Sequence, residues 1–210
     1  MLYPLFMELE NRSVLVIGGG AVAERKVLSL VETGARVTVI APEATENLQR
    51  LADDRTIELR PRKFEESDLE DAVLVISATD DPPTQERVTS AARKRRVPVN
   101  AVDQPALCDF IVPAIVRRGD VVVAISTSGK SPALAAALRS KLENVLTHDA
   151  ARAAQILGEL RSEVHARFPD SIRRKAALER VVASGILHWI GSCDDAEALQ
   201  RARRIIAQSS

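Results

Sequence analysis

The stretch SVLVIGGGAVAERK, residues 13–26, joins a run of apolar residues to a glycine turn and then to a helical pattern. A short, continuous apolar run such as Ser13–Ile17 is typical of a buried parallel strand. After the glycines, apolar residues recur at the spacing of one helix face, and Gly34 follows where a helix is expected to end. The chain is therefore predicted to open with a strand, a tight turn and a helix whose buried face carries Ala23, Val27, Leu30 and Val31.

The turn has the spacing Gly18-x-Gly20-x-x-Ala23, which is that of a dinucleotide-binding fingerprint. Gly18 permits the tight turn, Gly20 lets the backbone approach a pyrophosphate, and Ala23 lets helix and strand pack closely. The first turn of the helix offers free N–H groups and partial positive charge to phosphates. A glycine turn that binds nothing is the alternative, but the position inside a strand–helix–strand unit favours a nicotinamide cofactor.

The second predicted strand, Arg36–Ile40, ends without the acidic residue that ordinarily holds the adenosine ribose. Ala41 and Pro42 follow it, and Glu43 comes next. Glu43 is one candidate for the ribose contact, and Pro42 with the surrounding backbone is the other. No arginine directly follows the strand to favour a 2′-phosphate, so the sequence favours NAD over NADP.

Strand and helix patterns alternate over the first half of the chain, which predicts an α/β fold with a Rossmann-type, doubly wound parallel sheet. The acidic pair Asp80 and Asp81 with the two prolines after it is a typical helix start. The further elements expected are a helix over 43–53, strands near 57–59, over 73–78 and over 97–102, and a helix from residue 80 with Val88, Ala91 and Ala92 buried.

The pattern changes after about residue 110. Residues 111–116 and 121–126 flank a turn-forming stretch, 117–120, and are expected to pair as antiparallel strands. Pro132 then opens a predicted helix, and the chain beyond Thr147 has helical periodicity throughout. We therefore expect three parts: a Rossmann NAD-binding domain over 1–112, a small α+β dimerisation element over 113–146 and a helical domain over 147–210.

Asp103 directly follows the last predicted strand of the sheet, at the edge where ligands of such sheets bind. A carboxylate at this place can abstract or orient a proton while a hydride leaves the substrate. The alternative is a structural Asx-turn before Pro105. Asp80 and Asp81 are better explained as helix caps, and Cys108 as a small buried apolar residue.

The stretch STSGKS, residues 126–131, resembles a phosphate-binding loop of nucleoside triphosphatases, but Ala124 stands where that motif needs its first glycine. We interpret it instead as an anion cradle, in which hydroxyl groups, a lysine and a helix N-terminus hold substrate carboxylates. A capped helix with a solvated lysine is an equally open alternative. The candidate substrate-binding residues are Ser126, Thr127, Ser128 and Lys130.

The composition argues against several classes of protein. Lys plus Arg equals Asp plus Glu at 29 each, so no charge excess calls for nucleic acid or a membrane surface. The N-terminus has no basic region before its apolar stretch, and the two cysteines are far apart, which predicts a reduced, cytoplasmic protein. The three histidines lack ligand spacing, so no metal site is predicted.

Several separated motifs together resemble the siroheme synthase N-terminal module, a family of precorrin-2 dehydrogenases and sirohydrochlorin ferrochelatases. The resemblance spans essentially the whole chain, and the motifs occur in the family's order. They are YPLF (3–6), VIGGGAVAERK (16–26), SATDD (77–81), VNAVDQP (99–105), DFIVPAI (109–115) and AISTSGKSPALAAALR (124–139).

The resemblance implies NAD-dependent oxidation of precorrin-2 to sirohydrochlorin, with Asp103 matching an aspartate implicated in that step and in metal insertion. It leaves open whether this chain also inserts ferrous or cobaltous ion, and whether it serves siroheme or cobalamin. A non-catalytic NAD(H)-sensing module is the alternative from another class. The missing strand-end acid is a family trait, and Thr127 falls where relatives carry a phosphorylatable serine. Relatives form homodimers through the middle element, with the site between the Rossmann and helical parts, and the matched NAD contacts are Ala21, Val22, Pro42, Glu43 and Thr79.

Overall fold

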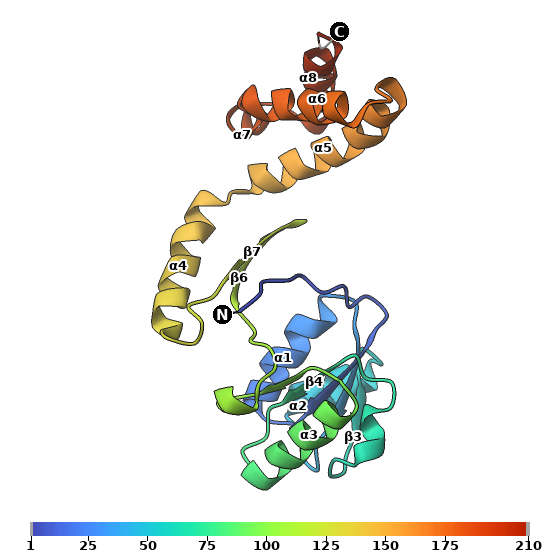
Figure 1. Ribbon diagram of the computed structural model, residues 1–210, viewed down its shortest axis with the longest axis vertical. Helices are drawn as coiled ribbons and strands as arrows, with labels where there is room; N and C mark the ends of the chain where they lie inside the picture. Colours follow the sequence, from blue (N-terminus) through green and yellow to red (C-terminus); the bar gives the residue numbers. More distant parts are fainter. Residues whose placement is uncertain (1, 209–210) are drawn as a thin grey trace. The chain divides into compact units, whose positions relative to one another are not determined.

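The computed structural model describes residues 2–208, and the chain divides between Val112 and Pro113 into two compact units. The first unit contains a five-stranded parallel sheet in the order β3-β2-β1-β4-β5, which confirms the predicted doubly wound sheet (Figure 1). Its elements are β1 (Ser13–Ile17), α1 (Ala21–Val31), β2 (Arg36–Ile40), α2 (Glu46–Asp53), β3 (Glu58–Arg60), η1 (Glu66–Leu69), β4 (Leu74–Ser77), α3 (Pro82–Lys94), β5 (Val99–Ala101) and η2 (Pro105–Leu107).

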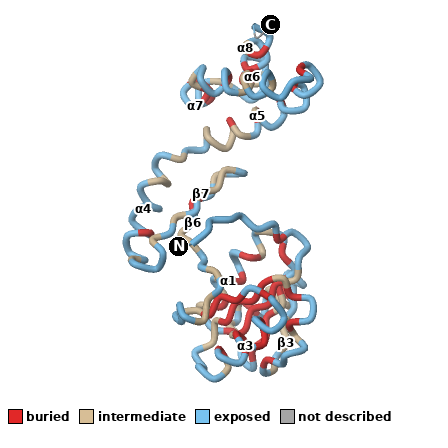
Figure 2. The backbone as a smooth tube through the Cα atoms, in the orientation of Figure 1, coloured by how far each residue is buried: buried red, intermediate tan, exposed pale blue. Residues whose placement is uncertain are grey.

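Helices cover both faces of this sheet because the side chains of each strand alternate between the faces. Along β1, Val14 and Val16 enter the apolar cluster that α1 and α2 complete. Leu15 and Ile17 enter the second cluster, to which α3 contributes. All four side chains are buried, and each contributes about 2 kcal/mol by leaving water. The buried core of the unit therefore lies on both sides of the strands. Figure 2 shows the strands of the sheet as largely buried.

The start of α2 differs from the prediction. A helix over 43–53 was expected, but α2 begins at Glu46. The N–H of Thr45 donates to the carbonyl of Gly19 at 2.9 Å, and the Thr45 hydroxyl accepts from the N–H of Leu48 at 3.3 Å. Thr45 therefore caps α2 and keeps the residues before it in a loop against the glycine turn.

The second unit begins with the predicted antiparallel pair, β6 (Ala114–Arg118) and β7 (Val121–Ile125). The prediction of a turn over 117–120 is wrong at its first two positions, because Arg117 pairs with Val122 and Arg118 with Val121. Gly119 has a φ of +55°, so two residues suffice to reverse the chain and the strand continues to Arg118. The first strand of the pair is also displaced from its predicted range of 111–116, since β6 starts only at Ala114.

Helices make up the rest of the second unit. The helical periodicity predicted beyond Thr147 is confirmed in α5 (His148–Arg167), where Ile156, Leu160 and Val164 are buried in the helical core. Arg152, near the start of α5, connects that helix to the segment before the last helix, donating to the carbonyls of Ile190 and Cys193 at 2.8 Å each. The helices are α4 (Pro132–Val145), α5 (His148–Arg167), α6 (Ser171–Ala183), α7 (Ile186–Trp189), the short η3 (Ile190–Ser192) and α8 (Asp195–Ala207).

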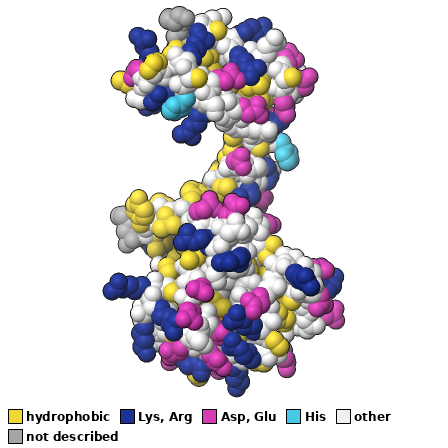
Figure 3. Space-filling view, turned by 90° about the vertical axis from the view of Figure 1, so that its right-hand side faces the viewer, with side chains coloured by type: hydrophobic (Ala, Val, Ile, Leu, Met, Phe, Trp, Pro, Cys, Tyr) yellow, Lys and Arg dark blue, Asp and Glu magenta, His cyan; other side chains and the backbone are white. Residues whose placement is uncertain are grey.

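The surface shows no segregation of charge by sign on the face seen in Figure 3, where Lys and Arg lie among Asp and Glu. Such mixing agrees with the equal numbers of acidic and basic residues in the chain. Within the described part of the chain, none of the helices combines the length and the apolar character that crossing a bilayer requires.

Candidate functional site

The candidate site of the first unit lies at the carboxyl edge of the sheet, where the strand register places the ends of four strands side by side. Ile17 of β1 pairs with Ile40 of β2 and with Ser77 of β4, and Ser77 pairs with Ala101 of β5. The residues that follow each strand therefore emerge along the same edge. The β1–β4 neighbourhood is also where the strand order reverses direction, which is where open α/β sheets bind ligands.

Each of the three glycines after β1 has a different surrounding that explains why glycine stands there. A Cβ on Gly18 would lie 2.4 Å from the carbonyl oxygen of Ala78, and the φ of Gly18 is +114°. A Cβ on Gly19 would lie 2.1 Å from the carbonyl oxygen of Glu43. A Cβ on Gly20 would meet nothing within 4 Å. Packing thus requires the first two glycines, whereas Gly20 borders open space at the N-terminus of α1, as expected for a turn that approaches a ligand.

Gly19 is a residue that the sequence reasoning missed, because the fingerprint treats its position as variable. Glu24 is another. Its carboxylate accepts from the Thr45 hydroxyl at 2.6 Å and from the Asn47 side-chain amide at 3.0 Å. The hydrogen bond from Thr45, followed by that from Asn47, lowers the pKa of Glu24, so the ionised carboxylate holds α1 to the start of α2.

A cavity of about 490 Å³ opens beside this loop, at the end of β2. Pro42 and Glu43, both predicted to contact the adenosine half of NAD, are part of its lining and are exposed. Gln49 on α2 borders the same cavity, and its side-chain amide donates to the carbonyl of Ala44 at 2.9 Å. The cavity therefore lies where the ribose of a dinucleotide is expected in this fold, next to the glycine turn.

Gln85 connects the ends of β4 and β5 and was not found from the sequence. Its side chain is buried, and its amide nitrogen donates to the carbonyl of Thr79 at 2.8 Å and to that of Val102 at 3.2 Å. Asp81 caps the same helix by accepting from the N–H of Thr84 at 3.2 Å, which agrees with the predicted capping role. One buried amide thus fixes two strand-end loops relative to each other.

We expect Gln85→Leu to destabilise the protein by about 2 kcal/mol, because it leaves two backbone carbonyls without their donor. Urea-induced unfolding followed by circular dichroism measures the change. Gln49→Leu is the matched control, since Gln49 is exposed and holds only one carbonyl, and it should cost about 0.5 kcal/mol or less. Equal losses in the two variants would contradict the bridging role.

Asp103 is exposed two residues beyond β5, and its backbone has a φ of +61°. The alternative of an Asx-turn before Pro105 is wrong, because proline has no N–H to donate to the carboxylate. Among the residues that the structure describes, none donates a hydrogen bond to this carboxylate. Burial lowers the pKa of the Lys26 ammonium, as does Arg25, while the charge of Asp103 opposes both effects. Asp103 and the half-buried Lys26 of α1 therefore interact through their charges.

The loop that carries Asp103 is closed by side chains that follow it. The Cys108 thiol donates to the carbonyl of Ala101 at 3.1 Å, and burial raises the pKa of this thiol. The Asn100 amide donates to the carbonyl of Phe110 at 2.9 Å, and the Asp109 carboxylate accepts from the N–H of Val99 at 3.2 Å. Cys108 is only half-buried and its thiol is a hydrogen-bond donor, so the prediction of a buried apolar residue is wrong in these respects, and the residue shapes the loop.

The predicted anion cradle forms a separate loop in the second unit, between β7 and α4. The Thr127 hydroxyl is already engaged, since it accepts from the N–H of Ser131 at 3.0 Å and donates to the Ser131 carbonyl at 3.1 Å. The Ser126 hydroxyl accepts from the N–H of Ser128 at 3.0 Å. Ser128 and Lys130 are exposed, with φ of +54° at Ser128. The substrate-binding assignment of these residues stays a prediction.

Comparison with known proteins identifies two regions of the chain. Residues 5–114 match the family described as "Putative NAD(P)-binding", which confirms the predicted dinucleotide-binding domain. Residues 118–144 match the family described as "Sirohaem biosynthesis protein central". The first match contains the glycine turn, the cavity beside β2 and Asp103, and the second contains the loop with Lys130.

Individual relatives agree with these matches. The siroheme synthase of Nitrosospira multiformis is 43% identical over 183 residues, covering 85% of this chain and 39% of the relative. The siroheme synthase of Thioalkalivibrio sulfidiphilus is 41% identical over 203 residues, covering 95% of this chain and 42% of the relative. The chain thus spans less than half the length of these relatives. The solved structure of SirC, a precorrin-2 dehydrogenase, aligns with a TM-score of 0.77 at 26% identity, covering 97% of this chain and 100% of that one.

Proposed function

Because this chain belongs to the siroheme synthase N-terminal module family, we propose that it catalyses the NAD-dependent dehydrogenation of precorrin-2 to sirohydrochlorin. One observation carries the proposal: an open glycine turn and an exposed carboxylate, Asp103, lie at the same edge of the parallel sheet. The first suits a dinucleotide and the second suits a proton acceptor. The names of the relatives and of the structural neighbour point to the same pathway.

The residues at the sheet edge fit NAD. Gly20 leaves open space at the N-terminus of α1, where the free N–H groups of Ala21 and Val22 would bind the pyrophosphate. The remaining contacts in this proposal come from Gly18 and Thr79 in the two central loops and from Pro42 and Glu43, which line the cavity beside β2. NAD supplies the hydride acceptor when it is bound.

Oxidation of precorrin-2 removes two hydrogens from the macrocycle, one as a hydride and one as a proton. In this proposal a carboxylate oxygen of Asp103 accepts the proton, since the carboxylate is exposed and has no competing hydrogen bond among residues 2–208. Lys26 of α1 contributes through its positive charge, which interacts with the charge of this carboxylate. The loop closed by Cys108 and Gln85 holds the carboxylate at the sheet edge.

The substrate carries eight carboxylates, and we assign the β7–α4 loop to bind some of them. Ser128 and Lys130 would make direct contacts because both are exposed. Ser126 and Thr127 would contribute mainly by holding the loop, since their hydroxyls accept backbone N–H groups within it.

The test is to incubate anaerobically prepared precorrin-2 with the protein and NAD, and to follow sirohydrochlorin by absorbance. We expect NAD-dependent turnover, and less with NADP, because no basic residue directly follows β2. Binding of NADH without any turnover of precorrin-2 would favour the alternative of a non-catalytic sensing module.

Insertion of ferrous or cobaltous ion into sirohydrochlorin is the second candidate activity. The exposed carboxylate of Asp103 supports it too, since metal insertion requires an acceptor for the pyrrole protons that the ion displaces. Repeating the incubation with each ion distinguishes the activities, because the metallated product differs in its absorbance from sirohydrochlorin. Product spectra unchanged by either ion would exclude this second activity.

The proposal divides the chain into a Rossmann part over 1–112, a middle element over 113–146 and a helical part over 147–210. Two copies of the chain would form a homodimer through their middle elements. The side chains of Leu134, Leu138 and Val145 on α4 support it, since all three are exposed apolar groups. We assign the protein to the cytoplasm, where free cysteines such as Cys108 and Cys193 persist. Sedimentation equilibrium tests the dimer, and we expect Leu138→Glu to shift the protein toward the monomer.

A further inference from the structure

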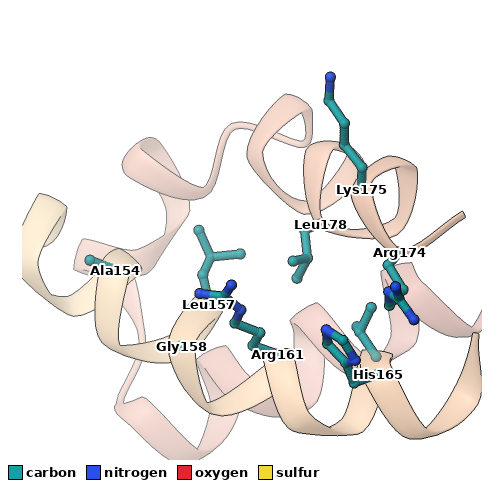
Figure 4. A pocket seen from close by; sticks show the side chains of 9 residues that line it. Ala154, Leu157, Gly158, Arg161, His165, Arg174, Lys175 and Leu178 are labelled. Carbon is teal, nitrogen blue, oxygen red and sulfur yellow. The ribbon is translucent and has the colours of Figure 1, made fainter. Parts of the chain in front are cut away.

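A hollow of about 450 Å³ lies between α5 and α6 of the second unit (Figure 4). It is separate from every residue assigned above to NAD or to the reaction. Its apolar lining comes from Leu157 and Val164 on α5 and from Leu178 on α6. Gly158 widens it, because a Cβ at that position would meet nothing within 4 Å. The floor therefore suits a flat apolar group.

The rim of this hollow is cationic. Arg161 and His165 of α5 and Arg174 of α6 border it, while Lys175 extends outward (Figure 4). None of the nine residues that line the hollow is acidic. Like charges gathered in this way repel one another, so the arrangement is relieved when an anion binds.

Arg161 and His165 of the rim lack the ion-pair partners that other arginines of the same unit have. Arg152 pairs with Asp195 at 2.7 Å, and Arg203 pairs with Glu163 on α5. In contrast, Arg161 and His165 have neither an ion pair nor a side-chain hydrogen bond anywhere in the described chain. Packing of the helical core thus leaves these two groups available for a ligand.

Arg174 and Lys175 complete the rim differently. Arg174 donates to the carbonyl of Pro169 at 2.8 Å, which holds its guanidinium at the end of α5. Lys175 lies 3.6 Å from Glu179, but this pair is exposed, and exposed pairs contribute little. Arg174 is therefore the preorganised cation of the site, Arg161 is its free cation, and His165 adds a free imidazole N–H donor.

We propose that this hollow binds an amphiphilic organic anion, an apolar ring system with carboxylates at its edge. Carboxylates would be held by Arg161, His165 and Arg174, and the ring would cover the floor formed by Leu157 and Leu178. The tetrapyrrole of the proposed reaction has this chemistry, and naming it as the ligand rests on the proposed function. The hollow would then hold a second tetrapyrrole molecule, on residues other than those assigned to the reaction.

The experiment measures equilibrium binding of uroporphyrin, a stable tetrapyrrole with eight carboxylates, to the whole chain. Fluorescence of Trp189, the single tryptophan, reports on the helical unit, where its ring is buried. We expect Arg161→Gln/His165→Gln to weaken this quenching phase about tenfold, since two charge-assisted contacts are lost. Arg180→Gln is the matched control, an exposed arginine of α6 that does not line the hollow, and it should bind like the wild type.

Each outcome decides the question. Identical isotherms for the double variant and the wild type would overturn the proposal, as would full competition by inorganic phosphate, which has no apolar body. Precorrin-2 turnover should stay unchanged in the double variant. If the wild type fails to oxidise precorrin-2 while uroporphyrin binding remains sensitive to the double substitution, the proposed function fails and the anion site stands.

Discussion

Asp103→Asn is expected to slow sirohydrochlorin formation by about 100-fold or more, without weakening NAD binding. The amide has nearly the shape of the carboxylate but cannot take up the proton. Asparagine also tolerates the left-handed backbone at this position, where φ is +61°, so the loop should keep its conformation. Absorbance of sirohydrochlorin under anaerobic conditions gives the rate, and NADH fluorescence gives the affinity.

Asp80→Asn is the control for this experiment, because Asp80 is another exposed carboxylate that follows a strand at the same sheet edge. Its removal should leave the rate within about twofold of the wild type, a change of well under 1 kcal/mol in the barrier. Near-normal turnover of Asp103→Asn would show that another group accepts the proton. Asp103→Ala is the less informative variant, since alanine in a left-handed conformation adds about 1 kcal/mol of backbone strain.

Gly19→Ala is expected to have the largest effect on stability, lowering the free energy of unfolding by about 3 kcal/mol. The added methyl group would lie 2.1 Å from the carbonyl oxygen of Glu43 and 2.9 Å from the Cβ of Ala41. One of these neighbours is backbone, which cannot rotate away as a long side chain would. Urea-induced unfolding measures the loss, and unfolding like that of the wild type would mean that the two loops are not in contact.

Gly20→Ala, one residue further on, should give the opposite pattern. Its Cβ would project into open space, and its backbone, with a φ of −81°, accepts alanine. Stability should therefore change by about 1 kcal/mol or less. NAD affinity should fall at least about tenfold, because the methyl group would occupy the place where the backbone approaches the pyrophosphate. Unchanged NAD affinity in this variant would remove the glycine turn from the cofactor site.

Local sequence was sufficient for most of the fold. The strand at Ser13–Ile17 and that at Arg36–Ile40 were predicted with their observed bounds, because continuous apolar runs between turn residues have few alternatives. The start of α2 and the length of β6 were mispredicted. The first depends on Thr45, whose N–H bonds to the carbonyl of Gly19, and the second on the left-handed φ of Gly119.

The candidate site was predictable only where a motif is contiguous. Gly18, Gly20 and Asp103 stand at strand ends that the sequence pattern locates. No sequence motif marks Gln85, because glutamine is common in polar helices. Its role depends on two loop carbonyls that lie within reach of its amide only in the folded chain. The sequence indicates this role only by placing a polar residue at a helix position where the apolar spacing predicts a buried side chain.

The sequence by itself determined that this chain has a parallel sheet, a dinucleotide-binding turn and an aspartate at the sheet edge, because those features depend on neighbours a few residues apart. Only the tertiary structure decided why Gly19 is glycine, why Gln85 is buried and why Arg161 has no ion-pair partner among residues 2–208. Each of these depends on the approach of segments distant in the sequence. Backbone carbonyls from another loop or a second helix supply the contacts, and no local periodicity encodes them.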